Sequence, residues 1–340
     1  MSEIDISIVL VNYKTTELTD NCLRSIYEFT RDLTFEIIII DNYSCDDAEV
    51  VLRAKYPSLV WLNMSENLGT SKAWNVGIKA AKGKYIVLLN SDTEFVDNAI
   101  SKLLAKYIAF EKNSKIGLLA CQIKGYDDII QYNSNLRFHT IKKYIYANSL
   151  YIWLFGERGK ILSETRLKQH LADHKTLWIG LVIGIIRRDI FENDSMYFEE
   201  DLFMYSEDVE WCYRLIKKGY RNYFSCTPTI LHVNSGSASS SAWKNGQVLV
   251  SEWIYFIKIK GKLYLLASIG VLLLNHLFDS MFYLKQKITG RITEGDKASK
   301  AWRSFVNDAL KRYFWKILFQ YRKKTSSAKT FLKYDVKKVS

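Results

Sequence analysis

The chain has 340 residues, 48% hydrophobic and 25% charged, so it is long enough for one large or two modest domains and is not disordered. Only 2 prolines and 16 glycines exclude a collagen-like or low-complexity chain. Five cysteines without a CxxC pair argue against a disulfide scaffold or a structural zinc site and fit a reducing compartment. The opening MSEIDISIVLVNY lacks the basic segment of a signal peptide.

The excess positive charge lies at the C-terminal end. The chain carries 48 Lys+Arg and 36 Asp+Glu, and 16 of the basic but only 4 of the acidic residues fall in 285–340. Residues 1–284 are therefore neutral, with 32 of each sign. A neutral body with a basic end favours contact of that end with an anionic surface and disfavours nucleic-acid binding.

The first 122 residues alternate between short apolar runs and segments of helical periodicity. Strands are predicted over 6–11, 35–40, 59–64, 85–89 and 116–122, and helices over 16–29, 48–56, 72–82 and 97–110. This alternation predicts an α/β fold with a mostly parallel sheet covered by helices on both faces. In such sheets, ligands bind beyond the carboxyl ends of the strands.

The next part of the sequence is less regular. Residues 124–176 are polar and aromatic and carry no firm assignment, while 178–186 predicts a strand and 209–218 a helix. A last strand is expected over 229–233, and 235–247, rich in Ser and Gly, predicts a loop or hinge.

Leu263–Leu284 is a stretch of 22 residues without Lys or Arg. Asn275, His276 and Asp279 would be costly at bilayer depth, so an interfacial or half-sunk helix is preferred to a spanning one. Aromatic and basic residues mix after it, as in 311–316 and 321–324, which favours an anionic membrane surface. The alternative is a helical hairpin that closes on the domain or on a second copy in a homo-oligomer.

Polar residues that could do chemistry follow several predicted strands. Asp41 could accept hydrogen bonds from a base or ribose, and Asp92, in Asn90-Ser91-Asp92, could bind a hard divalent cation. Glu207 and Asp208 begin a predicted helix, where the macrodipole favours the ionised form that a general base needs. His232 ends a strand. Each group alone could instead serve a turn, a helix cap or the core.

Several motifs are absent from the sequence. There is no GxGxxG after the first strand, no Walker A loop and no GxSxG elbow. Dinucleotide-dependent oxidation, P-loop nucleotide hydrolysis and hydrolase chemistry are therefore disfavoured.

The order of these pieces resembles the family-2 glycosyltransferases of the GT-A fold, from about 6 to 239, and is closest to the bacterial rhamnosyltransferase-like branch that builds surface polysaccharides. The stretches that carry the resemblance are IVLVNYKTTELTDNCLRSI, IIIIDNYSCDD, SENLGTSKAWNVGIKAAKGKYIVLLNSDTEF, YFEEDLFMYSEDVEWCYRLIKKGY and ILHVNSGSAS. Motifs in this order are far more specific than any single one of them.

The resemblance implies a role for each matching residue. Asp41 matches the carboxylate that contacts the nucleotide, and the other nucleotide-pocket positions are Asn12, Tyr13, Asn67, Gly69, Asn75 and Asn90. Asp92 matches the metal-binding aspartate and His232 a histidine that completes the metal shell, with Mg²⁺ or Mn²⁺ as cofactor. Asp208 matches the catalytic base, and Glu207 is the fallback. Leu181 stands where the family usually has Gly. The shape of the pocket floor on the acceptor side is therefore in doubt.

The implied activity is an inverting, metal-dependent transfer of one sugar to a hydroxyl of a lipid-linked saccharide in capsule, O-antigen or other surface-polysaccharide synthesis. No Gln begins the Gln-x-x-Arg-Trp motif of processive relatives. The expected donor is dTDP-rhamnose; UDP-glucose, UDP-galactose, UDP-galactofuranose and UDP-N-acetylhexosamines stay open, as does a non-catalytic nucleotide-sugar or lipid-binding module.

The expected organisation is a catalytic domain over 1–245, with a variable acceptor region at 124–206, and a helical membrane-association or oligomerisation region over 246–340. The expected location is the cytoplasmic face of the bacterial cell membrane.

Overall fold

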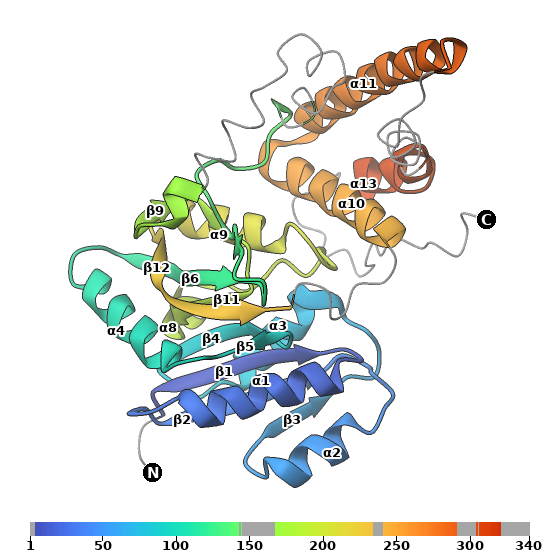
Figure 1. Ribbon diagram of the computed structural model, residues 1–340. Coiled ribbons are helices and arrows are strands. Elements are labelled where there is room, and N and C mark those ends of the chain that lie inside the picture. Colours follow the sequence, from blue (N-terminus) through green and yellow to red (C-terminus); the bar gives the residue numbers. More distant parts are fainter. Residues whose placement is uncertain are drawn as a thin grey trace. The chain divides into compact units, whose positions relative to one another are not determined.

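The computed structural model describes residues 4–142, 144, 167–233, 241–290, 304 and 306–320 (Figure 1). These residues form two compact units. The first contains 4–138, 167–200 and 207–233, and the second contains 139–142, 144, 201–206, 241–290, 304 and 306–320. The second unit thus begins before the predicted boundary at 246 and also includes two earlier segments.

The first unit is built on a ten-stranded mixed sheet. Its main path runs in the order β3 (Val60–Asn63), β2 (Phe35–Asp41), β1 (Ile6–Asn12), β4 (Tyr85–Asn90), β11 (Ile183–Arg187), β6 (Ile116–Lys124), β12 (Arg221–His232) and β5 (Thr93–Glu94). The first four of these strands are mutually parallel, as are β6 and β12, whereas β11 is antiparallel to both neighbours. β7 (Ile130–Gln131) adds to β6 and β9 (His174–Thr176) to β12; β8 (Ser134–Asn135) and β10 (Trp178–Ile179) form a separate pair.

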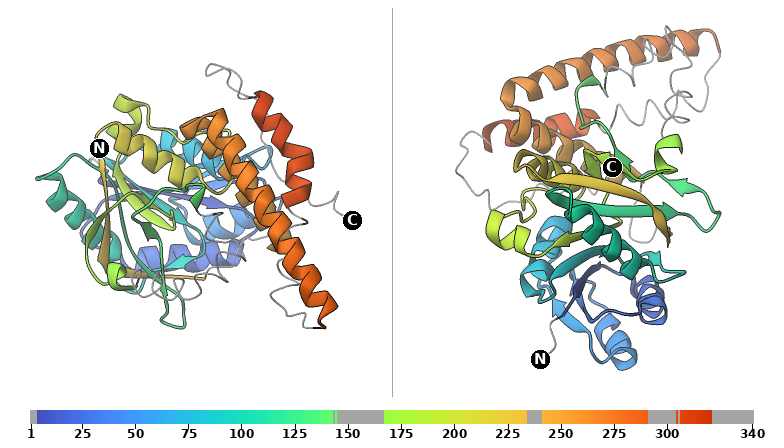
Figure 2. Two further views of the ribbon diagram at one scale, coloured as in Figure 1. Left: turned by 90° about the horizontal axis from the view of Figure 1, so that it is seen from above. Right: turned by 90° about the vertical axis from the view of Figure 1, so that its left-hand side faces the viewer.

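Helices cover both faces of this sheet, which confirms the predicted fold class (Figures 1 and 2). α1 (Thr16–Phe29), α2 (Ala48–Lys55) and α4 (Ala99–Glu111) pack on one face; α3 (Gly69–Ala80), α8 (Asp189–Asp194) and α9 (Glu207–Lys217) pack on the other. β1 shows the alternation that this requires, because Ile8 and Leu10 join the first core and Val9 joins the second. A Cβ at Gly77 would lie 2.4 Å from Val9 Cγ1, so glycine permits α3 to pack closely on the strands.

Three predicted elements differ from the structure. The apolar run 178–186 is two strands, β10 and β11, because the chain turns at 180–182 instead of continuing the ladder. The last strand is longer than the apolar stretch 229–233, because alternation of exposed and buried residues begins at Arg221. Part of the predicted loop, Ser241 to Gln247, is helical and begins α10 (Ser241–Lys260), whose packed apolar residues outweigh weak local propensity; residues 234–240 lie outside the described part.

The second unit is helical and contains α10, α11 (Lys262–Ile288), the π-helical turn η1 (Leu310–Phe314) and α13 (Trp315–Gln320). Lys258 pairs with Asp201 at 2.8 Å and Ser251 Oγ donates to the Met204 carbonyl at 2.7 Å, so α10 holds the segment 201–206. Glu252 is buried and accepts a 2.7 Å hydrogen bond from the Tyr144 hydroxyl.

α11 is one long helix (Figure 2). Its two sides differ in exposure. At 3.6 residues per turn its exposed large apolar residues fall on one side. They form the apolar stripe of α11: Leu263, Leu266, Leu273, Leu274, Leu277, Phe278, Met281, Leu284 and Ile288. The opposite side packs inside the unit, where the Tyr264 hydroxyl accepts from the Ile141 N–H at 2.8 Å and Asn275 Nδ2 donates to the Tyr144 carbonyl at 2.5 Å.

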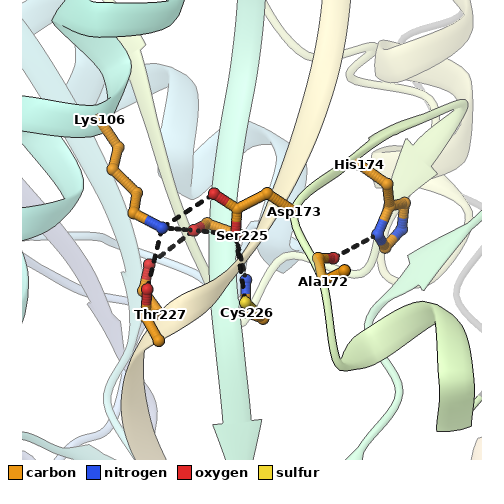
Figure 3. Close-up of polar contacts among 7 residues, drawn as sticks. All are labelled: Lys106, Ala172, Asp173, His174, Ser225, Cys226 and Thr227. Carbon is orange, nitrogen blue, oxygen red and sulfur yellow. Dashed lines mark hydrogen bonds and ion pairs between the residues drawn. The ribbon is translucent and has the colours of Figure 1, made fainter.

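A polar cluster fixes an irregular stretch of β12 (Figure 3). The pairing of β12 with β6 shifts register between Ser225 and Thr229. Lys106 of α4 donates to Ser225 Oγ at 2.7 Å, Thr227 Oγ1 at 2.9 Å and Asp173 Oδ2 at 2.9 Å. Burial opposes ionisation of Asp173, but hydrogen bonds from Lys106, Ser225 and Cys226 outweigh it and lower its pKa.

Replacing Lys106 by Met is expected to destabilise the fold by about 1–2 kcal/mol, because it leaves a half-buried carboxylate and two hydroxyls without their shared donor. A depressed carboxyl pKa stabilises the fold above the ordinary Asp range and loses that effect as the pH falls. The difference from the wild type should therefore shrink in acid. Urea unfolding across pH measures this, with Lys102→Met as the control, because the ion pair of Lys102 with Asp97 is more exposed than that of Lys106 with Asp173. Equal losses in both variants would contradict the prediction.

Candidate active site

Three neighbouring strands end in polar residues at the same edge of the sheet. β1 ends at Asn12, β2 at Asp41 and β4 at Asn90, and Asn12 is paired in register with Asp41. The edge lies at the carboxyl ends of parallel strands, where the sequence predicted a ligand site.

The Asp41 carboxylate is held by donors from the end of β1 and from the loop that follows β2. It accepts hydrogen bonds from Asn12 Nδ2 at 2.8 Å, the Ser44 N–H at 3.0 Å and Ser44 Oγ at 2.5 Å. Asn12 Oδ1 in turn accepts from the hydroxyls of Thr15 at 3.1 Å and Thr19 at 2.9 Å. A carboxylate has about four acceptor positions, so Asp41 keeps limited capacity for a ligand and a fixed orientation toward it.

The same network reaches the loop that carries Asp92. Thr15 Oγ1 lies 3.2 Å from Ser91 Oγ, so a continuous run of buried hydrogen bonds joins Asp41 to the residue before Asp92. The sequence did not single out Thr15, Thr19, Ser44 or Ser91. A signal was present for three of them, since Thr15, Ser44 and Ser91 follow a predicted strand by a few positions, whereas Thr19 lies in the predicted helix 16–29.

The two loops at this edge contain left-handed main-chain conformations. Lys14, Tyr43 and Cys45 have φ values of 57°, 70° and 55°. Such conformations are unfavourable for residues other than glycine and gather at binding sites. Tyr13, between Asn12 and Lys14, is half-buried at the mouth of the first loop.

The start of α3 is tied to the loop that follows Asp41. Asn42 Nδ2 donates to Asn67 Oδ1 at 3.1 Å, and Asn42 Oδ1 accepts from the Leu68 N–H at 2.8 Å. Asn67 Oδ1 also accepts from the N–H of Gly69, whose φ of +73° suits glycine.

Asn75, six residues further along α3, forms hydrogen bonds with the backbone of Phe198. Its Nδ2 donates to the Phe198 carbonyl at 2.9 Å, and its Oδ1 accepts from the Phe198 N–H at 2.8 Å. Nδ2 also lies 3.2 Å from Glu200 Oε1. Asn75 therefore positions the segment 198–200 beneath this edge.

Asp92 and His232 meet where β5 pairs with the end of β12. His232 Nε2 lies 3.3 Å from Asp92 Oδ1, and the Val233 N–H donates to the Asp92 carbonyl at 3.0 Å. His232 is buried and Asp92 half-buried. Among the residues that the structure describes, no three His, Cys, Asp or Glu side chains gather as a metal cage.

Glu207 and Asp208 form an acidic pair at the start of α9, with Glu207 buried and Asp208 half-buried. Burial is the main cause that raises the pKa of both carboxyl groups, and the charge of Asp208 adds to the rise at Glu207. Hydrogen bonds from the N–H groups of Val209 and Leu181 favour ionised Asp208. Within the described residues, Glu207 Oε2 is buried without a hydrogen-bond partner. Asp208 is therefore the member of the pair that is prepared to carry the negative charge.

A short stretch of chain joins the acidic pair to the edge of the sheet. The Leu181 N–H binds Asp208, and the carbonyl of the next residue, Val182, accepts from the Asn90 N–H at 2.9 Å. Asn90 is two residues before Asp92. Leu181, at the position where glycine was expected, is itself buried, while a Cβ on Gly180 would lie 3.8 Å from Asp208 Oδ2. A side chain at position 180 would thus contact Asp208.

The fold and this edge define an α/β enzyme of the GT-A glycosyltransferase class. Comparison with known proteins agrees: the profile described as "Glycosyl transferase family 2" matches residues 7–193, and the chain belongs to that family. It is a glycosyltransferase.

Individual relatives are distant. An uncharacterized glycosyltransferase of Methanocaldococcus jannaschii is 27% identical over 205 residues, which are 55% of this chain and 68% of that protein. An amylovoran biosynthesis glycosyltransferase of Erwinia amylovora is 29% identical over 171 residues, 48% of this chain and 55% of that protein. The chain spans about half the length, or less, of several other curated relatives.

A solved structure shares the fold. It is a mannosyltransferase of Pyrobaculum calidifontis in complex with GDP-Man and Mn²⁺, with a TM-score of 0.56 and 14% sequence identity. The similarity covers 93% of this chain and 88% of the mannosyltransferase.

Proposed function

We propose that this glycosyltransferase moves one sugar from a nucleotide sugar to a hydroxyl of a lipid-linked saccharide, with inversion, in the synthesis of a cell-surface polysaccharide. The observation that carries the proposal is the 3.3 Å contact of His232 with Asp92, whose loop is linked to Asp208 through Asn90, Val182 and Leu181. The hydrogen-bond network of Asp41 reaches the same loop at Ser91. The amylovoran biosynthesis enzyme among the relatives supports the polysaccharide setting.

The donor is proposed to lie across the ends of β1, β2 and β4. Asp41 would accept from the base or ribose, Asn12 and Tyr13 would border the same pocket, and Asn67 and Gly69 would form its floor. Asn75 contributes by holding 198–200, and Asn90 by holding Val182. dTDP-rhamnose is the proposed donor, with UDP-hexoses and UDP-N-acetylhexosamines as the alternatives.

Asp92 and His232 fit a divalent cation. An oxygen and an imidazole nitrogen 3.3 Å apart can both ligate one ion, and Mg²⁺ or Mn²⁺ commonly takes its other ligands from water and substrate phosphates. A bound ion would neutralise the diphosphate and stabilise it as a leaving group. The mannosyltransferase of the same fold was solved with Mn²⁺, which supports this assignment.

Asp208 is proposed as the general base. Its carboxylate would take the proton from the acceptor hydroxyl as that oxygen attacks the anomeric carbon from the face opposite the diphosphate. One displacement through an oxocarbenium-like state inverts that centre, by analogy with inverting glycosidases. The N–H groups of Val209 and Leu181 hold the carboxylate still during this step.

The second unit is proposed to bind the anionic inner face of the cell membrane through α11. Lys262–Lys285 is long and apolar enough to cross a bilayer, but that length and composition also suit other helices. Asp279 lies on the side of α11 opposite the apolar stripe, and burying a charge at bilayer depth costs about 2.5–3.5 kcal/mol. A helix that lies in the membrane surface keeps that side with the protein.

Removal of the metal should stop transfer. In excess EDTA we expect activity to fall to background and to return with Mn²⁺ or Mg²⁺, and we expect Asp92→Ala to weaken both the metal response and donor binding. Initial rates against metal concentration, with calorimetric donor binding, measure this. Full activity in EDTA, or unchanged donor affinity in the variant, would contradict the metal site.

The donor itself can be found by thermal shift. A true donor stabilises the fold by mass action, so dTDP-rhamnose with Mn²⁺ should raise the melting temperature more than UDP-glucose, UDP-galactose or UDP-N-acetylglucosamine does. Stabilisation by none of these compounds would count against a nucleotide-sugar enzyme.

A further inference from the structure

Both polar atoms of the Gln131 side-chain amide contact His232. Its Nε2 donates to the His232 carbonyl at 3.0 Å, and its Oε1 lies 2.6 Å from His232 Nδ1. Turning the amide over would set two oxygens against each other at the carbonyl and an NH₂ group against the ring N–H. The contact with the carbonyl therefore fixes which amide atom faces the ring.

The orientation of the amide fixes the tautomer of His232. With Oε1 as the acceptor, Nδ1 carries the proton, and the neutral ring keeps a lone pair on Nε2. That lone pair faces Asp92 Oδ1 at 3.3 Å, beyond the roughly 2.7–2.9 Å of a charge-assisted N–H···O bond. Two ligands at about 2.1 Å from one ion, set near a right angle, lie about 3 Å apart. The geometry suits a cation between the two groups.

Gln131 reaches His232 from a separate part of the sheet. It ends β7, which pairs with β6 in the register Ile123 with Gln131. The loop before β7 is anchored as well, because the Tyr126 hydroxyl donates to Glu94 in β5, next to the strand end that holds His232. The backbone of Gln131 is therefore placed by β-ladder contacts, independently of the two contacts that its amide makes with His232.

We propose that Gln131 is a positioning residue of the metal site, which sets the tautomer and rotation of His232 and so the affinity for the divalent cation. The proposal rests on the proposed function, because it takes Asp92 and His232 as the metal ligands. Partners of this kind orient ligating imidazoles, and their loss lowers metal affinity by about 10- to 100-fold.

The test is Mn²⁺ binding to the full chain, followed by electron paramagnetic resonance of free Mn²⁺ in the presence and absence of UDP. Gln131→Leu should raise the Mn²⁺ dissociation constant by about 10- to 100-fold. Gln131→Glu keeps an acceptor for Nδ1–H but sets an oxygen against the His232 carbonyl, so its loss of affinity should be smaller than that of Gln131→Leu. Nitrogen chemical shifts of His232 in metal-free protein should show the Nδ1–H tautomer in the wild type and a mixture in Gln131→Leu.

Gln122→Leu is the matched control. Gln122 also donates to a histidine carbonyl, that of His170 at 2.8 Å, and accepts from Thr229, away from the proposed metal site. It should lower stability and leave Mn²⁺ binding unchanged. If Gln131→Leu binds Mn²⁺ like the wild type while Asp92→Ala does not, the positioning role is overturned and the metal site stands. If neither Asp92→Ala nor His232→Ala alters Mn²⁺ binding, the metal site itself is wrong.

Discussion

Asp208→Asn is expected to lower the turnover number by about 10²- to 10⁴-fold, the usual contribution of a general base, while nucleotide-sugar binding survives. The substitution keeps the shape of the side chain and an oxygen that can accept from the Val209 N–H, but it removes the proton acceptor. Product formation with a saturating donor measures the loss, and donor calorimetry measures binding. Turnover like that of the wild type would reject the assignment.

The pH dependence follows from the raised pKa of the acidic pair. The base must be ionised, and burial shifts its titration upward, so kcat/KM should fall as the pH is lowered at values above the ordinary Asp range. An acid limb at the ordinary Asp value would mean that the working carboxylate is solvated and is not Asp208.

Glu207→Gln is the matched control next to it. The variant keeps Asp208 and should retain most of its turnover. If Glu207→Gln instead loses most of its turnover while Asp208→Asn retains activity, Glu207 is the base. Folding raises the pKa of Glu207, so ionisation of Glu207 destabilises the fold. The stability of the wild type therefore falls as the pH rises from the ordinary carboxyl pKa through the raised pKa of Glu207. Glu207→Gln should therefore melt above the wild type in alkaline buffer and level with it near the ordinary carboxyl range.

Leu273→Glu with Leu277→Glu is expected to release the protein from anionic vesicles. Both residues are exposed members of the apolar stripe of α11. Fully burying a leucine contributes about 1.5–3 kcal/mol, and each 1.4 kcal/mol is a factor of about ten, so the pair should reduce partitioning at least about 100-fold. Flotation with phosphatidylglycerol vesicles measures this, and deletion of 263–340 should release the protein as well.

Leu171→Glu is the control, because Leu171 is an exposed leucine of the first unit and should leave vesicle binding unchanged. Salt should weaken the attachment only in part, because the stripe is apolar while Lys285 and Lys287 at the end of α11 are exposed. Vesicle binding like the wild type would show that the stripe does not contact lipid. A wild-type dimer that the double substitution dissociates, without vesicle binding, would assign the stripe to a second copy.

The regular part of the fold could be predicted because its pattern is local. The helix over 16–29 and the strands that end at Asn12 and Asp41 follow from periodicity alone, since each buries one stripe or both faces. The short strands β7 to β9 could not be predicted, and β10 is merged with β11 into one predicted strand. β7 to β10 are only 2 or 3 residues long and exist through pairing with distant partners, which no local pattern records.

The residues of the candidate site also fall into a predictable and an unpredictable group. The side chains that end strands could be singled out, because a polar residue after an apolar run is visible in the sequence. Their partners could not: Gln131 meets His232 across 101 positions of chain, and Asn75 meets Phe198 across 123. Such pairs depend on sheet order, and the sequence gives no register between strands so far apart.

α3 connects the proposed nucleotide pocket to the helix that carries the proposed general base. Gly69 at its first turn is bound to the loop after Asp41, and Trp74 contacts Phe198, with ring centroids 5.1 Å apart. Phe198 in turn packs at 4.4 Å on Trp211 of α9, the helix that begins with the acidic pair. Substitutions around Asn42 that change the nucleotide preference would therefore shift α3 and, through Phe198, the start of α9 with the proton acceptor Asp208. Donor selectivity and catalytic rate should then be hard to engineer separately.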